Sequence, residues 1–221
     1  MDLMKQLYQF DTPEISDALD SLNIEGALLG IKAIQPNIKV IGPAFTIKYL
    51  PYLEKPSEFQ NAGNYIDDVP ENSIILIDNA GREDCTIWGN ILTEVALTRN
   101  IAGTVIFGAV RDIHAIKLSN YPVYASAIYM RSGKNRVYKS EQQCNLCING
   151  VVIKPQDVVM CDDNGVIIIP KDILSQVIER ANNIKKNEKN IIISIQNGSS
   201  LKKARNIFKY NQPWISNDKD L

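Results

Sequence analysis

The chain has 221 residues, of which 45% are hydrophobic and 22% charged, and its formal net charge is −1. These values are typical of a globular protein with one sizeable core. The balanced charge, without a long basic run, argues against a nucleic-acid partner. No apolar run approaches the ~20 residues needed to span a bilayer, and the first residues lack the apolar segment of a signal peptide. We therefore expect a cytoplasmic protein that does not bind a membrane.

The first predicted element is a helix over residues 15–22. Asp11, Pro13 and Glu14 mark its start, as a cap, a first-turn proline and an acid. Residues 39–49 alternate like a strand, with a break or bulge expected at Gly42-Pro43. A helix over 58–67 and a continuously apolar strand over 73–78 follow. The glycine-containing polar loop 79–84 is expected to wall a pocket at the end of that strand.

The next two elements carry the candidate site. Residues 90–100 predict a helix with Asn90 as its N-cap, and Gly103 supplies the turn after it. A strand over 104–107 then runs back and is expected to stop at Gly108. Arg111 and Asp112 lie on the turn that follows.

The predicted helix and the predicted strand match in length. About ten helical residues cover ~15 Å, and five or six extended residues cover ~17 Å. The helix start and the strand end therefore meet at one edge of a sheet, where open α/β sheets bind ligands. Unpaired N–H groups at the helix start, together with Arg111, predict a pocket for a small anion such as a carboxylate. Asp112 adds a hard oxygen ligand suited to Mg²⁺ or Mn²⁺.

The second half of the chain predicts a different kind of structure. A short helix over 112–118 and a strand over 121–124 come first. The polar segment 126–141 has three interpretations, a mobile cover over the pocket, a subunit contact or, preferred here, an ordinary solvated loop. Short antiparallel strands are then expected over residues 147–152, 157–161 and 165–169.

The C-terminal part is predicted to be helical. One long helix is expected over 170–186, and a more polar helical segment over 188–197 and 200–210. The polar segment cannot form its own core, so it is expected to lie on a neighbouring subunit. The chain is therefore expected to consist of an α/β/β domain, 1–186, and a helical extension, 187–221.

Several single residues invite a functional interpretation. Cys144 and Cys147 form a CxxC motif, but with one histidine in the chain they do not readily complete a zinc site. The apolar alternation around them favours packed strand residues over a redox pair. His114 is expected at the surface, and Trp88 and Tyr65 are expected to be packing residues.

An ordered set of motifs gives a specific resemblance. They are ISDALD (15–20), VIGPAFTIK (40–48), IILIDNAG (74–81), WGN (88–90), GTVIFGAVRD (103–112), PVYA (122–125) and the run over 149–170. The chain resembles the RraA-like family, which contains regulators of ribonuclease E activity and class II 4-hydroxy-4-methyl-2-oxoglutarate aldolases. The resemblance implies an α/β fold, a swivelling β/β/α sandwich with a C-terminal helical extension. It also implies a homotrimer or homohexamer with its sites between subunits.

The aldolase branch is marked by an Asp, twenty residues and then Arg-Asp. By that match, Arg111 binds the carboxylate and enolate oxygen of pyruvate, and Asp112 ligates the Mg²⁺ or Mn²⁺ ion. The backbone N–H groups of Ile91 and Leu92, beside Gly89, hold the carboxylate.

The leading acid of that pattern is replaced here by Asn90. Asn90 and Glu188, the latter from a neighbouring subunit, are expected to act on the metal through water. An asparagine carries no charge and cannot accept a proton as a base, so weaker metal binding is expected.

Two functions from different classes follow from the resemblance. The first is a metal-dependent lyase that cleaves C–C bonds of small 2-oxo acids through a pyruvate enolate. Its type is a 4-hydroxy-4-methyl-2-oxoglutarate/4-carboxy-4-hydroxy-2-oxoadipate aldolase and oxaloacetate decarboxylase. The alternative is a non-catalytic regulatory protein that binds a ribonuclease or another protein; Asn90 favours it and the intact Arg111-Asp112 pair disfavours it. No glycine-rich S-adenosylmethionine loop is visible, which argues against a methyltransferase.

Overall fold

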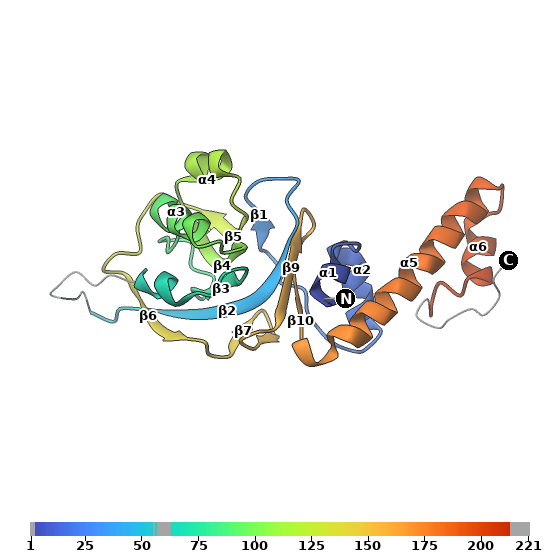
Figure 1. Cartoon of the computed structure of the whole chain (residues 1–221), viewed down its shortest axis with the longest axis horizontal. Helices are drawn as coiled ribbons and strands as arrows, with labels where there is room; N and C mark the ends of the chain where they lie inside the picture. Colours follow the sequence, from blue (N-terminus) through green and yellow to red (C-terminus); the bar gives the residue numbers. More distant parts are fainter. Residues whose placement is uncertain (1–2, 55, 57–62, 213–221) are drawn as a thin grey trace. The chain divides into compact units, whose positions relative to one another are not determined.

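The computed structural model describes residues 3–54, 56 and 63–212 and divides into two compact units (Figure 1). The larger unit covers residues 26–171, and the smaller unit combines residues 1–25 with 172–221. Of the helices in the described part of the chain, none has both the length and the apolarity needed to cross a membrane.

A curved sheet is the framework of the larger unit. Four neighbouring strands pair in parallel, namely β2 (Val40–Pro51), β3 (Ile74–Asp78), β4 (Gly103–Val110) and β5 (Val123–Ile128). Antiparallel strands extend both sides, with β1 (Lys32–Ala33) beside β5, and β6 (Val137–Gln142), β9 (Val158–Asp162) and β10 (Gly165–Ile169) beyond β2. Residues 27–28 pair with β10, where Leu28 N donates to Val166 O at 2.9 Å. The sheet is therefore nearly closed.

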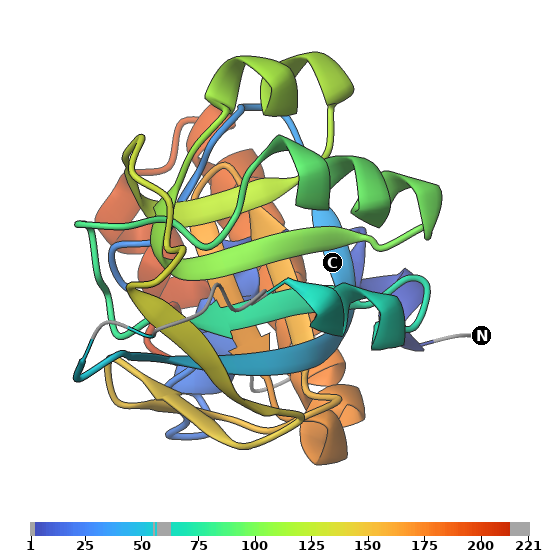
Figure 2. The same cartoon turned by 90° about the vertical axis from the view of Figure 1, so that its left-hand side faces the viewer.

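Both faces of the parallel strands are covered. On one face, α3 (Asn90–Thr98), α4 (Ile113–Ser119) and the 3-10 helix η1 (Asn64–Asp68) enclose a cluster that includes Ile106 and Trp88 (Figure 2). On the other, Val105 packs with β9, β10 and the hairpin of β7 (Leu146–Ile148) and β8 (Val151–Ile153). Neighbouring residues of a strand point to opposite faces, so strands buried on both sides have continuous apolar runs.

Two of the predicted packing residues lie in the first of these clusters. Trp88 is buried and stacks on Tyr121, with ring centroids 6.2 Å apart. Tyr65 is buried and meets Tyr49 edge to face. The prediction that Trp88 and Tyr65 are packing residues is confirmed.

Several strand predictions need correction. β4 does not stop at Gly108 but continues to Val110 through a register shift between Ile106 and Ala109. β2 is not broken at Gly42-Pro43; instead its pairing changes there, from β9 to β3. The Gly42 position is crowded, because an added Cβ would lie 2.6 Å from the backbone oxygen of Asn72.

Three further segments differ from prediction. The expected strand over 147–152 is a hairpin, because Asn149 and Gly150 both adopt positive φ, 51° and 89°, and form its turn. The expected loop over 126–141 contains most of β6. Of the expected helix over 58–67, residues 58–62 lie outside the described residues, and a 3-10 helix begins at Asn64.

The smaller unit is helical. It contains α1 (Leu3–Leu7), α2 (Thr12–Asp20), α5 (Leu174–Gln196) and α6 (Leu201–Ile207), and the 3-10 turn η2 (Lys171–Ile173) precedes α5. The predicted start of α2 is confirmed as a capping box, in which Asp11 N donates to Glu14 Oε2 at 2.8 Å.

The predicted break between two C-terminal helices near residue 187 is wrong. Helix α5 runs without interruption from Leu174 to Gln196, because its buried stripe continues across that point, from Ile184 through Asn187 to Ile191. The domain boundary proposed at 186/187 therefore lies inside a helix. Residues 213–221 of the proposed extension lie outside the described residues, and its packing on a neighbouring subunit stays a prediction.

Candidate functional site

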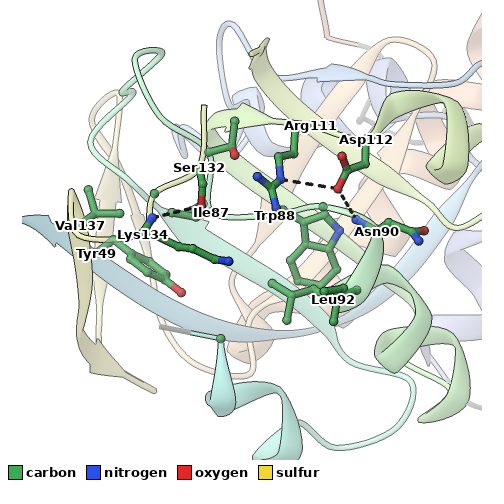
Figure 3. Close-up of a pocket in the computed structure, with 15 residues that line it drawn as sticks. Tyr49, Ile87, Trp88, Asn90, Leu92, Arg111, Asp112, Ser132, Lys134 and Val137 are labelled. Carbon is green, nitrogen blue, oxygen red and sulfur yellow. Dashed lines mark hydrogen bonds and ion pairs between the residues drawn. The ribbon is translucent and has the colours of Figure 1, made fainter. Parts of the chain in front are cut away.

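The end of β4 and the start of α3 meet at one edge of the sheet. Arg111 N donates to Trp88 O at 3.2 Å. Asn90 N donates to Asp112 Oδ2 at 2.9 Å, as Figure 3 shows. These two hydrogen bonds join the strand end to the helix start, as predicted from the matched lengths of the helix and the strand. The Arg111-Asp112 pair therefore lies beside the positive end of α3.

Asp112 is held in an unusual conformation. Its φ of 59° and ψ of 36° are left-handed, a region that Asp enters more readily than most residues, and α4 begins directly after it. Its Oδ2 accepts the Asn90 N–H and lies 3.5 Å from Arg111 Nε. The carboxylate is thus oriented by a hydrogen bond from the first residue of α3 and by an ion pair with the adjacent arginine.

Asn90 is not the N-cap of α3, contrary to the sequence prediction. Gly89 occupies the cap position, and Asn90 is the first helical residue. The carboxylate of Asp112 accepts the N–H of Asn90, so a residue from the end of a neighbouring strand provides the capping interaction.

Gly89 provides the space for this arrangement. Its backbone is extended, with φ −170°, a conformation that any residue can adopt. A Cβ at this position, however, would lie 2.4 Å from Asp112 Oδ2 and 3.2 Å from Arg111 Nε. The close approach of the Arg-Asp pair to α3 therefore requires glycine.

The predicted amide donors lie at the start of α3. Its first intrahelical donor is Thr93 N, which bonds Gly89 O at 3.1 Å. The N–H groups of Ile91 and Leu92 precede this bond, at the positive end of the helix dipole. The Thr93 side chain fixes this turn, because Thr93 Oγ1 accepts from Trp88 Nε1 at 3.0 Å and lies 3.1 Å from Gly89 O.

These groups line a cavity of about 340 Å³. One side is formed by Gly89, Asn90, Ile91, Leu92, Arg111 and Asp112. Tyr49, Ser132, Lys134 and Val137 form another side, away from Asn90 and Asp112 (Figure 3). The volume lies within the range of small-molecule sites.

Tyr49 and Lys134 were not among the site residues predicted from the sequence. Lys134 lies in the segment 126–141, for which a cover over the pocket was one of the interpretations, and residues 132–134 and 137 do line the cavity. The loop 79–84, predicted to wall it, does not contribute to the lining. Arg82 of that loop instead pairs with Asp84 at 2.7 Å.

The side chain of Asn90 has an unusual environment. Its Oδ1 atom is buried and has no hydrogen-bond partner among the described residues. Its amide points away from Arg111 (Figure 3). Buried polar atoms are normally paired, so an unpaired acceptor beside a cavity marks a place where a bound group can supply the missing partner.

The donor set fits a weakly held divalent cation. Among the described residues, no three His, Cys, Asp or Glu side chains gather closely enough to hold a metal ion. Mg²⁺ is often bound through only one or two carboxylates, with water and substrate oxygens completing its shell. Asp112 is compatible with such a site, whereas the Asn90 amide, which points away from Arg111, would have to turn to contribute.

Glu188 lies on α5, in the other compact unit. Burial raises the pKa of its carboxyl group, and the nearby carboxylates of Asp17 and Glu14 add to this, whereas Lys185 opposes it. Its expected action in the site of a neighbouring subunit stays a prediction.

The remaining candidates are not part of the cavity. His114 is exposed, as expected, and does not line it. All four cysteines are free; Cys144 is half-buried and Cys147 is exposed. The prediction of a packed core position is wrong for Cys147, because it is the outward-facing residue of the short strand β7.

Comparison with known proteins identifies the family. The sequence model described as RraA-like, Aldolase/RraA, matches residues 12–168, and the chain belongs to this family. The chain is 52% identical over 217 residues to protein DlpA of Legionella pneumophila, a match that covers 98% of this chain and 35% of DlpA. It thus spans about a third of that relative's length. A protein of Halalkalibacterium halodurans named "Putative 4-hydroxy-4-methyl-2-oxoglutarate aldolase" is 32% identical, with 82% of each chain covered.

Solved structures agree with the fold. An uncharacterized protein from Pseudomonas syringae superposes with a TM-score of 0.83 at 40% identity, covering 92% of this chain and 96% of the other. RraAS2 of Streptomyces coelicolor, described as an unusual member of the RNase ES inhibitor RraA family, gives 0.76 at 20% identity, covering 85% and 94%. The predicted RraA-like α/β fold is confirmed.

Proposed function

We propose that this chain is a divalent-metal-dependent lyase that cleaves a C–C bond of a 2-oxo acid through a pyruvate enolate. The observation that carries the proposal is the arrangement of Arg111, Asp112 and the first amides of α3 around one small cavity. The relative named as an aldolase, which matches most of the chain, supports the reaction class.

The substrate carboxylate would bind at the start of α3. The N–H groups of Ile91 and Leu92 donate to it, and the helix dipole favours its negative charge. This places the 2-oxo group towards Arg111. The buried Trp88 and the half-buried Leu92 form an apolar wall beside these donors. By excluding water, this wall strengthens the electrostatic attraction between the N–H groups and the carboxylate.

Asp112 would hold Mg²⁺ or Mn²⁺ directly, and Asn90 would contribute through water. When bound, the cation supplies Lewis-acid polarisation of the 2-oxo group. As the C3–C4 bond breaks, its electron pair forms the C2–C3 double bond of the enolate, and negative charge develops on the C2 oxygen. The Arg111 guanidinium stabilises that charge.

The fragment beyond C3 leaves either as a carbonyl compound or as CO₂. A retro-aldol cleavage also needs a base for the hydroxyl proton at C4, which Asn90 cannot provide. Decarboxylation of oxaloacetate needs no such base. It is therefore the reaction that the replacement by Asn90 impairs least.

The test is magnesium-dependent decarboxylation of oxaloacetate, followed as pyruvate formation with and without a chelator. We expect activity that the chelator removes, and its loss in Arg111→Ala and in Asp112→Ala. His114→Ala, an exposed change close by in the chain, serves as control and should keep it. Full activity in either site variant would reject the assignment.

The second candidate is a non-catalytic regulatory protein that docks on a ribonuclease or another protein. The observation that favours it is Asn90, which supplies neither charge nor base at the leading position of the site. Folded wild-type protein that forms no pyruvate above the chelated background would support this candidate over the lyase.

A further inference from the structure

The peptide unit between Gly89 and Asn90 links the start of α3 to the carboxylate of Asp112. Its N–H, from Asn90, donates to Asp112 Oδ2 at 2.9 Å. Its C=O, from Gly89, accepts from the backbone N–H and from the hydroxyl of Thr93, each at 3.1 Å. A trans peptide is planar and its C=O and N–H point in opposite directions, so contacts that fix the carbonyl also fix the direction of the N–H.

The hydroxyl of Thr93 is buried and is used both as an acceptor and as a donor. It accepts from the Trp88 indole N–H at 3.0 Å and donates its proton to Gly89 O. Thr93 is 0% exposed and Trp88 is 2% exposed. Burying a hydroxyl costs free energy unless it is paired, and valine has nearly the same shape without that cost. Packing alone therefore does not account for a hydroxyl at this position.

The indole of Trp88 is itself held in place by β4. It stacks on Tyr121 with the two ring planes 12° apart, and Tyr121 Oη lies 3.0 Å from Thr104 Oγ1. Thr104 is near the start of β4, and just after the end of this strand Arg111 N donates to the backbone oxygen of Trp88. The same strand thus determines where the indole N–H lies and where the backbone of Arg111 lies.

These contacts form one directed chain of hydrogen bonds. It runs from the Trp88 N–H through the Thr93 hydroxyl to the Gly89 carbonyl. Across the peptide unit it continues from the Asn90 N–H to the Asp112 carboxylate. Each donor in such a chain polarises the next one, and the last acceptor is charged, so the chain strengthens the hydrogen bond that holds the carboxylate.

The direction of the Asp112 carboxylate depends on this hydrogen bond. The side chain is 41% exposed, and its contact with Arg111 Nε is longer, at 3.5 Å. A carboxylate with this much exposure can rotate towards solvent unless a short hydrogen bond holds it. The Asn90 N–H supplies that bond, and Thr93 holds the other side of the same peptide unit.

We propose that Thr93, held by the Trp88 indole, is a positioning residue for the Asp112 carboxylate. It acts through the peptide unit between Gly89 and Asn90, whose N–H it directs at the carboxylate that binds Mg²⁺. Thr93 itself does not line the cavity. This inference rests on the proposed function, because it takes Asp112 as the ligand of the cation.

The first test follows the Asn90 N–H directly. In an NMR spectrum of protein with isotope-labelled asparagine, the backbone amide signal of Asn90 is identified by its loss in Asn90→Asp. A hydrogen bond to a carboxylate moves an amide proton downfield, so we expect Thr93→Val to move this signal upfield. Asp112→Ala, which removes the acceptor, should move it further in the same direction.

The second test measures the affinity for Mg²⁺ alone by titration calorimetry. Thr93→Val and Thr93→Ala should bind Mg²⁺ about tenfold more weakly, the lower end of the effect of removing a group that orients a metal ligand. Thr93→Ser keeps the hydroxyl and should keep most of the affinity. Two variants without the hydroxyl are used, because a folded Thr93→Ala decides the test if Thr93→Val does not fold.

Thr98→Val is the matched control. Thr98 Oγ1 donates to Glu94 O at 2.9 Å, which is the same type of bond, four residues back along the same helix. Thr98 is exposed and does not line the cavity, so this variant should leave the Asn90 signal and the Mg²⁺ affinity unchanged. Equal effects of Thr98→Val and Thr93→Val would show a general weakening of α3 and would overturn the proposal. An Asn90 signal or a Mg²⁺ affinity that survives loss of the Thr93 hydroxyl would also overturn it.

The outcome separates this proposal from the lyase function. Protein whose Asn90 signal and Mg²⁺ affinity depend on the Thr93 hydroxyl, but which forms no pyruvate from oxaloacetate, keeps the positioning role and loses the lyase assignment. Protein that decarboxylates oxaloacetate, with an Asn90 signal and a Mg²⁺ affinity that do not depend on the hydroxyl, keeps the lyase and loses the role of Thr93. Wild-type protein that binds no Mg²⁺ overturns both.

Discussion

Gly89 leaves the space in which Asp112 and Arg111 approach helix α3. We expect Gly89→Ala to push the Asp112 carboxylate away from the Asn90 amide, because the added Cβ would lie 2.4 Å from Oδ2. The change should destabilise the protein by about 1–3 kcal/mol, as overpacking usually does, and strongly reduce decarboxylation. Denaturant unfolding and pyruvate formation measure the two effects.

Gly30→Ala provides the matched control. Gly30 has φ 82° and nothing within 4 Å of an added Cβ, so the substitution strains the backbone without crowding the site. It should lower stability and leave the activity of the folded protein unchanged. An active Gly89→Ala protein would show that the approach of Asp112 to Asn90 is not needed for function.

Asn90 is the residue that distinguishes this chain from the pattern of the aldolases. We expect Asn90→Asp to tighten Mg²⁺ binding by roughly tenfold or more, the usual size of an effect from a group that contacts a metal through water. Titration calorimetry with Mg²⁺ alone measures it, and Asn90→Ala is the comparison. An unchanged affinity in Asn90→Asp would show that this side chain does not reach the cation.

At the scale of elements, Glu188 gives α5 a pH-dependent stability. Burial, then Asp17 and Glu14, raise the pKa of Glu188, so folding disfavours its charged form. The stability linked to this group is complete below its ordinary pKa and is lost as the pH rises through the raised value. We expect Glu188→Gln to be more stable than wild type at neutral pH, with the difference shrinking at about pH 4.

Thermal unfolding at the two pH values tests this, with Glu179→Gln, an exposed change on the same helix, as control. A less stable Glu188→Gln protein at neutral pH contradicts the prediction. A loss of decarboxylation without loss of stability would instead support the expected role of Glu188 in the site of a neighbouring subunit.

The elements also show where local patterns were sufficient. Helix α2, strand β3 and the start of α3 follow from capping residues and apolar periodicity, and the structure has them within three residues of prediction. The hairpin at Asn149-Gly150 was missed, because the apolar run on both sides concealed a two-residue turn. The continuity of α5 was missed because its outer face becomes polar while its buried stripe continues.

At the scale of the whole molecule, the smaller unit has apolar side chains that its own residues do not cover. Ile192 is 55% exposed, Leu201 48% and Ile207 50%, on the neighbouring helices α5 and α6. We expect another subunit to cover them in a homotrimer or homohexamer. Ile192→Glu combined with Ile207→Glu should lower the mass in solution towards that of a monomer, since buried charges without partners are costly.

Sedimentation velocity measures that mass. Val152→Glu, which changes an exposed apolar residue of β8 in the larger unit, is the comparison and should leave the mass unaltered. A wild-type monomer, or a double variant of unchanged mass, would show that these side chains do not form a subunit contact.

The sequence by itself determined the family, the order of most strands and helices, and the meeting of Arg111 and Asp112 with the start of α3. The family follows from the resemblance of an ordered set of motifs. The order of the elements and the meeting at α3 follow from periodicity, capping residues and the matched lengths of consecutive elements, which are local properties of the chain. The tertiary structure alone decided that Asp112 caps α3, that Gly89 has no space for a side chain, and that Tyr49 and Lys134 complete the cavity. Each of these depends on contacts between residues far apart in the sequence, whose distances and packing no local pattern encodes.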